Sequence, residues 1–143
     1  MDSLAEPEKR GRITKKRQQE RTGTDKEVEK IDTNKDNEEL RQLVYISMLC
    51  NDTKVGENNK LTGDPTETAL IDMGFRLDFK PEIFELMPRV EEIPFDSDRK
   101  LMTTVHKVSD KKYMVYTKGG VDELLARCNS YVINGKVLTD IDK

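Results

Sequence analysis

The first half of the chain contains a stretch in which hydrophobic residues recur at helical spacing. In DNEELRQLVYISMLCND, residues 36–52, Asp and Asn capping candidates and acidic residues open the stretch, as expected of a first helical turn. The pattern then predicts a helix with one core-facing stripe. The residues of that stripe are Leu40, Leu43, Val44, Ser47 and Met48.

A second helix is predicted from TGDPTETALIDMGF, residues 62–75. Asp64 stands at the N-cap, Pro65 at the first helical position and Glu67 at the third, which is the pattern of a capping box. We expect its buried face to consist of Ala69, Leu70 and Met73. A short third helix is predicted over residues 81–86.

After Pro88 the hydrophobic period changes from helical to alternating, which is typical of strands. The alternation predicts antiparallel neighbours joined by polar turns at 96–99 and 109–112. The three predicted strands are residues 90–95, 101–108 and 113–118.

Turn residues organise the end of the sequence. GGVDELLARC turns through Gly119 and Gly120 into a short helix, and YVINGKVL predicts a hairpin because Asn134-Gly135 favours a type I′ turn. The last residues, TDIDK, are typical of a helix start that is cut off. Together these elements predict an α/β (α+β) fold in which an antiparallel sheet is flanked by short helices.

Composition separates the ordered part from the rest. The 143 residues are 37% charged and only 34% hydrophobic, so we expect part of the chain to stay solvated. Residues 1–35 are interpreted as a polar, flexible segment, and residues 36–143 as one domain. The run EKRGRITKKRQQER suggests a nucleic-acid arm, but it has no aromatic residue to stack on a base, and a solvated tail is favoured.

Several other classes of protein find little support. The net charge of −3 gives no overall attraction to nucleic acid. The sequence contains no long apolar run of the kind that would predict direct membrane insertion by this chain. Cys50 and Cys128 are far apart, which is typical of reduced cysteines. His106 is the single histidine, and the glycine-rich pieces do not form a P-loop, so we assign no catalytic residue and no metal ligand.

Three separated motifs stand in the order and approximate spacing of one known family. They are CND at 50–52 with GDPTETAL at 63–70, then PFDSDRKLMTTVH at 94–106, then YTKGGVDELLARC at 116–128. Together they resemble the nucleotide-binding domain of P-type cation-transporting ATPases, and are most like the bacterial calcium-transporting members of type II.

The resemblance implies roles for two residues that have simpler interpretations. The family's glutamate at the position of Glu67 accepts a hydrogen bond from the adenine amino group, whereas the local pattern alone has Glu67 closing its capping box. The family's aromatic at the position of Phe95 stacks on adenine, whereas a phenylalanine at a strand end is more often a core residue.

The resemblance also implies further residues that line the nucleotide pocket, where a lysine ammonium offers charge to the phosphates and to the face of the base. Lys100 and Lys118 match lysines that line the family's pocket, although isolated lysines of this kind are usually only solvated. We expect Arg99 to face the phosphates or to pair with Asp96 or Asp98. The remaining residues implied for the site are Met102 and Gly119, with Gly120 as a further candidate beside Arg99.

Two departures from the family's pattern matter. The usual Lys-Gly-Ala-Pro-Glu is replaced by Lys118, Gly119, Gly120, Val121 and Asp122, which puts affinity in doubt. The phosphorylated aspartate's motif, Asp-Lys-Thr-Gly-Thr-Leu-Thr, is absent, because Thr22-Gly23-Thr24 lacks the flanking residues. A segment with a late nucleotide-contacting arginine is also missing, so we expect a fragment that is truncated at its C-terminus.

The resemblance thus implies an ATP-binding domain that presents the γ-phosphate to an aspartate on a separate phosphorylation domain. Its partners would be ATP or ADP, Mg²⁺ carried with the nucleotide, and the phosphorylation and actuator domains of the same pump. The whole protein would be an integral membrane cation translocase, for calcium by likeness, with this domain in the cytoplasm and inactive alone. The alternatives are an interaction module without a nucleotide site and a nucleic-acid binder that uses residues 9–21.

Overall fold

The first described helix, α2 (Glu38–Leu49), begins where the sequence predicts it. The computed structural model describes residues 37–139; the predicted tail 1–35 and nearly all of TDIDK lie outside them. Asn37 caps α2 by accepting a hydrogen bond from the backbone N–H of Leu40 at 3.2 Å. The predicted stripe is buried except at Leu43, which is 57% exposed, because the buried face follows Leu40, Val44, Ser47 and Met48.

Helix α3 (Pro65–Arg76) also starts as predicted, but its buried face is different. The Asp64 carboxylate accepts a hydrogen bond from the Thr66 N–H at 2.9 Å. Ile71 and Gly74 are buried, whereas Ala69 is exposed and Leu70 and Met73 are only half-buried. The reason is α2: a Cβ on Gly74 would lie 2.3 Å from the Met48 sulfur, so the two helices meet there.

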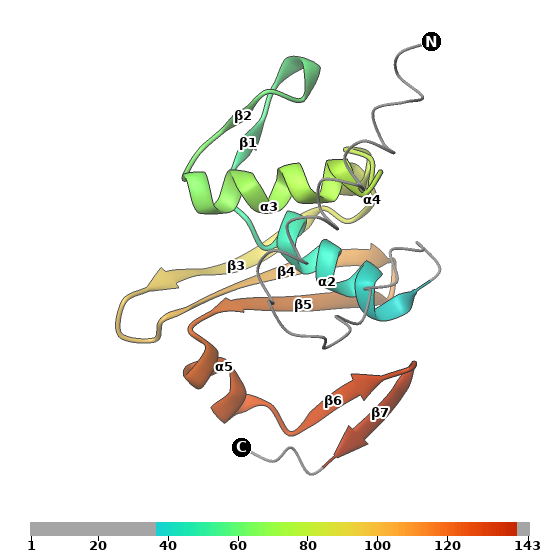
Figure 1. Cartoon of the computed structure of the whole chain (residues 1–143), viewed down its shortest axis with the longest axis vertical. Coiled ribbons are helices and arrows are strands. Elements are labelled where there is room, and N and C mark those ends of the chain that lie inside the picture. Colours follow the sequence, from blue (N-terminus) through green and yellow to red (C-terminus); the bar gives the residue numbers. More distant parts are fainter. Residues whose placement is uncertain (1–36, 140–143) are drawn as a thin grey trace, which may run out of the picture. The chain divides into compact units, whose positions relative to one another are not determined.

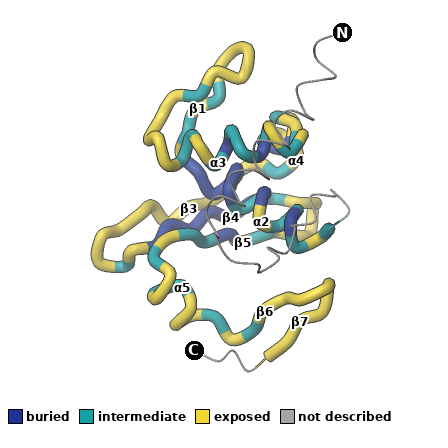
Figure 2. Tube along the Cα trace, viewed as in Figure 1, coloured by how far each residue is buried: buried dark blue, intermediate teal, exposed yellow. Residues whose placement is uncertain are grey.

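The central sheet confirms the three predicted strands. Strands β3 (Arg89–Asp96), β4 (Leu101–Ser109) and β5 (Lys112–Gly119) pair antiparallel in the order β3-β4-β5. Helix α2 packs on one face of this sheet, where Val44 and Met48 join Met102 and Tyr116 in the core. The ribbon shows α2 beside β4 and β5 (Figure 1), and the buried residues gather at that contact (Figure 2).

Shorter elements complete the described residues. Helices α4 (Ile83–Leu86) and α5 (Val121–Arg127) and the hairpin of β6 (Ser130–Ile133) and β7 (Lys136–Thr139) follow the prediction. Asn134 and Gly135 both have positive φ, at 50° and 75°, as a type I′ turn requires. The small hairpin of β1 (Lys54–Val55) and β2 (Leu61–Thr62), with the 3₁₀ turn η2 (Glu57–Asn59), was not predicted. The antiparallel sheets and short helices confirm the expected fold class.

Candidate functional site

A bulge in β3 brings three of the predicted site residues into one row. Ile93 pairs with Thr103 and Asp96 with Leu101, so Pro94 and Phe95 together stand opposite Met102. On the other side of β4, Met102 pairs with Lys118. Directly opposite residues on antiparallel strands are neighbours. Phe95, Met102 and Lys118 therefore form a row that crosses the three strands β3, β4 and β5.

The members of this row differ in exposure. Phe95 lies on the edge strand and is 61% exposed, so an apolar ring is presented to solvent rather than buried. Met102 is only 2% exposed and belongs to the core cluster with Val44 and Tyr116. Met102, which the resemblance implies for the site, therefore forms the buried middle of the row between Phe95 and Lys118.

Helix α3 contributes Glu67 to the Lys118 end of the row. The Lys118 ammonium donates a hydrogen bond to Glu67 Oε1 at 2.8 Å, and the two side chains are 22% and 20% exposed. Glu67 Oε2 accepts a hydrogen bond from the backbone N–H of Asp52 at 2.9 Å. The expected capping box is therefore replaced by contacts to a loop and a strand, because the Glu67 carboxylate points away from its own helix start.

The turn between β3 and β4 carries Lys100 close to the end of β5. A Cβ on Gly119, whose φ is 150°, would lie 2.2 Å from the Lys100 carbonyl oxygen, so glycine permits this close approach. The next N–H, that of Gly120, donates to the same oxygen at 2.9 Å. The Lys100 ammonium lies 3.3 Å from Glu123 Oε1, and the Lys100 side chain is 60% exposed. The pKa of Glu123 is lowered by its own backbone N–H and by Lys100.

Arg99 lies outside this arrangement. Its guanidinium donates hydrogen bonds to the Leu101 carbonyl at 3.2 Å and to Thr103 Oγ1 at 3.0 Å, in place of the expected ion pair with Asp96 or Asp98. Thr103 follows Met102 on β4 and so faces the opposite side of the sheet.

Asp96 has a structural role in the same turn. Its carboxylate accepts hydrogen bonds from the backbone N–H groups of Asp98 and Arg99, and these bonds lower its pKa. The acidic turn thus reverses the chain, as the sequence predicts.

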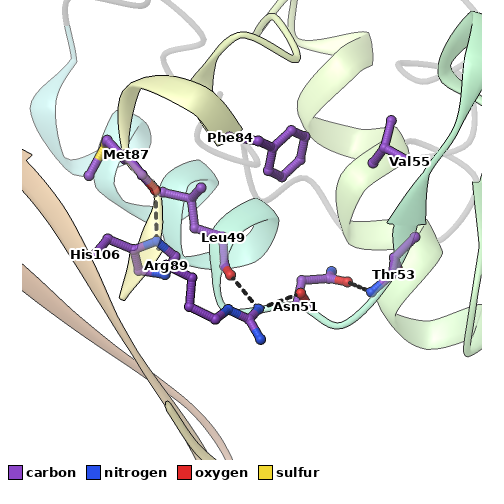
Figure 3. A pocket seen from close by; sticks show the side chains of 8 residues that line it. All are labelled: Leu49, Asn51, Thr53, Val55, Phe84, Met87, Arg89 and His106. Carbon is purple, nitrogen blue, oxygen red and sulfur yellow. Dashed lines mark hydrogen bonds between the residues drawn. The ribbon is translucent and has the colours of Figure 1, made fainter. Parts of the chain in front are cut away.

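Sequence reasoning missed a polar network next to Glu67, formed by Asn51, Asp52 and Arg89. Arg89 and Asn51 also line a pocket of about 310 Å³ (Figure 3). None of the predicted site residues lines that pocket, whose remaining walls are Leu49, Thr53, Val55, Phe84, Met87 and His106. The CND motif could have indicated this network from the sequence. Its partner Arg89, however, lies 38 residues away from Asn51 along the chain.

The remaining polar chemistry is modest. Cys50 and Cys128 are free, and burial raises the pKa of the Cys50 thiol, which makes it an unreactive core residue. Within residues 37–139, no group of three or more His, Cys, Asp or Glu side chains is arranged to hold a metal ion. Over the same residues, no helix has both the length and the apolar character needed to cross a membrane.

Comparison with known proteins identifies the family of this chain. Residues 39–143 match the family described as "P-type ATPase, cytoplasmic domain N", and the chain belongs to that family. It is 44% identical over 113 residues to calcium-transporting ATPase 1 of Bacillus cereus, covering 77% of this chain and 12% of that protein.

Two further bacterial relatives are similarly close. The calcium-transporting ATPase lmo0841 of Listeria monocytogenes is 46% identical over 98 residues, which cover 67% of this chain and 11% of that protein. Calcium-transporting ATPase 1 of Lactococcus lactis is 41% identical over 96 residues, which cover 66% of this chain and 11% of that protein. The chain therefore spans about an eighth of the length of these relatives, and is a domain of a P-type cation ATPase.

Proposed function

We propose that this domain binds ATP on the row Phe95–Met102–Lys118, with Glu67 at one end. The observation that carries the proposal is the β3 bulge, which sets an exposed aromatic ring in line with a lysine whose ammonium is held by Glu67. An exposed ring can stack on a base, and a carboxylate can accept a hydrogen bond from the adenine amino group.

The Glu67 carboxylate has the capacity for this role although it already has two partners. Oε1 accepts from Lys118 and Oε2 accepts from Asp52. Each carboxylate oxygen has two lone pairs, so one site on each oxygen is available to an amino group. Lys118 then supplies positive charge beside the base and Lys100 supplies it toward the phosphates, and Gly119 and Gly120 keep the Lys100 turn close to the end of β5.

In the whole protein, the bound nucleotide would be presented to an aspartate on a separate phosphorylation domain. The contribution of this domain is positioning, and the hydrolysis of ATP and the transport of a cation, calcium by analogy with the relatives, belong to the full pump. That pump would hold this domain on the cytoplasmic side of a membrane, next to phosphorylation and actuator domains. Mg²⁺ would arrive on the phosphates, and we assign none of residues 37–139 to it.

The proposal is tested by following backbone amide NMR signals during titration with ATP, with and without magnesium. We expect saturable shifts around Glu67, Phe95 and Lys118, with weak affinity because a few contacts leave the triphosphate largely unclamped. Phe95→Ala should weaken binding about tenfold, as expected for loss of one base–aromatic stack.

Val115→Ala is the matched control. Val115 is an exposed apolar strand residue, 59% exposed, but it pairs with Val105 on the opposite face of the sheet. Its truncation should leave ATP binding unchanged. If the folded wild-type chain shows no saturable shifts at millimolar ATP, or if both truncations weaken binding equally, the proposed site is wrong.

A further inference from the structure

We propose that Asn51 and Arg89 are positioning residues that fix the Glu67 carboxylate for recognition of the adenine amino group; this inference rests on the proposed function. Neither residue belongs to the row on the sheet. Each acts through the short loop of residues 50–53, which joins the end of α2 to β1 and lies against the first turn of α3.

Asn51 connects two helices through a buried amide. Its side-chain nitrogen donates hydrogen bonds to the Ser47 carbonyl at 3.0 Å and to the Glu67 carbonyl at 2.8 Å. Its side-chain oxygen accepts one from the Thr53 N–H at 2.9 Å. The residue is 5% exposed, so these bonds replace water and would be costly to lose. One of them holds the main chain of Glu67 itself.

Arg89 holds the same loop from the side of the sheet. One guanidinium nitrogen donates to the carbonyls of Leu49, the last residue of α2, at 3.1 Å and of Asn51, in the loop that follows, at 2.7 Å (Figure 3). The other donates to the carboxylates of Asp52 and Glu92, both at 2.9 Å. Burial opposes the charge of Arg89, but these carboxylates raise its pKa overall.

The two residues together determine where the Glu67 carboxylate lies. Arg89 orients Asn51 and Asp52; Asn51 then holds the Glu67 carbonyl, and the Asp52 N–H holds Glu67 Oε2. A lysine at position 89 keeps the charge but lacks the planar fork that contacts four acceptors at once. The position of the carboxylate is thus set by a neighbouring loop instead of by its own helix.

The experiment compares two nucleotides in the intact chain. ATP and purine riboside triphosphate, which lacks the 6-amino group, are titrated by NMR into wild type, Glu67→Gln, Arg89→Lys and Asn51→Ser. We expect wild type to prefer ATP roughly tenfold, as for one hydrogen bond to a charged group. In each of the three variants this preference should fall toward one, with affinity for the analogue nearly unchanged.

A double variant separates positioning from an independent effect. Asn51→Ser combined with Glu67→Gln should reduce the preference no further than Glu67→Gln alone, because both changes act through one carboxylate. Arg76→Lys is the matched control, since Arg76 is an exposed arginine near the end of α3 that pairs only locally with Asp72. It should keep the wild-type preference.

The outcomes are distinguishable. If Arg89→Lys and Asn51→Ser are folded and keep the wild-type preference while Glu67→Gln loses it, the positioning role is overturned and the nucleotide site stands. If wild type binds no ATP, or Glu67→Gln keeps the preference, the assignment of Glu67 fails and the inference fails with it. Amide spectra report folding, and if one positioning variant unfolds, the other decides.

Discussion

Lys118 and Lys100 are both lysines beside a glutamate, yet their surroundings differ. The Lys118–Glu67 pair is 2.8 Å long and about four-fifths shielded from solvent, and Glu67 is also held by the Asp52 N–H. The Lys100–Glu123 pair is 3.3 Å long, and Lys100 is mostly exposed. One lysine is therefore fixed by packing and hydrogen bonds, whereas the other is fixed mainly by its backbone. We expect Lys118 to set the geometry of the site and Lys100 to adjust to the ligand.

The largest effect is expected from removing the backbone contact that places Lys100. Gly119→Ala puts a Cβ against the Lys100 carbonyl and imposes an unfavourable φ, so we expect the free energy of unfolding to fall by about 2–3 kcal/mol. Gly56→Ala is the control, because a Cβ there meets only an ordinary contact at 3.6 Å. Urea unfolding measures both variants; an equal loss in the two would show that the Gly119 contact has no special importance.

Removing Lys118, the partly shielded partner of Glu67, should have the next largest effect. Lys118→Met leaves a mostly shielded carboxylate without its ion-pair partner, which should cost about 1–2 kcal/mol of stability. ATP affinity should fall as well, because a positive charge beside the bound base is lost and Glu67 loses the partner that holds it. Adding Glu67→Gln to Lys118→Met should recover part of the stability, measured by urea unfolding. A double variant less stable than Lys118→Met would contradict this coupling.

Lowering the pH should destabilise the domain through His106, which lies on the same face of the sheet as Lys118. This side chain is buried on the same face as Met102 and Thr104, with Nδ1–H donating to the Met87 carbonyl and Nε2 accepting from the Thr104 hydroxyl. Burial lowers its pKa, and nearby Arg89 lowers it further.

The sign of the pH dependence follows from that shift. Because the folded pKa lies below the unfolded value of about 6.5, the unfolded chain binds the proton more strongly, so the free energy of unfolding falls as pH decreases through 6.5 toward the lowered folded pKa. His106→Gln should flatten this slope between pH 7 and 5. The lowered pKa values of Asp96 and Glu123 contribute only at more acidic pH. An unchanged slope in His106→Gln would assign the dependence to other groups.

The smallest effect is expected at the exposed pair. Lys100→Met should leave the melting temperature nearly unchanged, because solvent screens the contact with Glu123. Its ATP affinity should decrease modestly and only at low salt, which isothermal titration at two ionic strengths would measure. A loss of affinity equal to that of Lys118→Met would remove the distinction between the two lysines.

The elements of this domain could be predicted from the sequence because their signals are local. Capping at Asn37 and Asp64, the alternation after Pro88 and the Asn134-Gly135 turn act over a few residues, and each is confirmed. The short hairpin β1–β2 escaped prediction because two-residue strands have no measurable period.

Contacts between distant residues could not be predicted in the same way. The buried face of α3 depends on Met48 of another helix, which occupies the space at Gly74. The Glu67–Lys118 pair joins residues 51 positions apart, and the contact between Arg89 and the Asn51 loop joins residues 38 apart. The resemblance to a family proposed Phe95, Glu67 and Lys118 together. It gave no indication that Met102 is core or that Arg99 belongs to the other face.

The bulge in β3 also has a consequence for how sequences of this kind are read. In a regular strand, residues two positions apart share a face, so Phe95 would lie beside Ile93 and opposite Leu101. The extra residue changes this parity, and Phe95 instead stands opposite Met102. One added residue thus moves an aromatic ring from one surface of the sheet to the other without altering the length of the neighbouring strand β4.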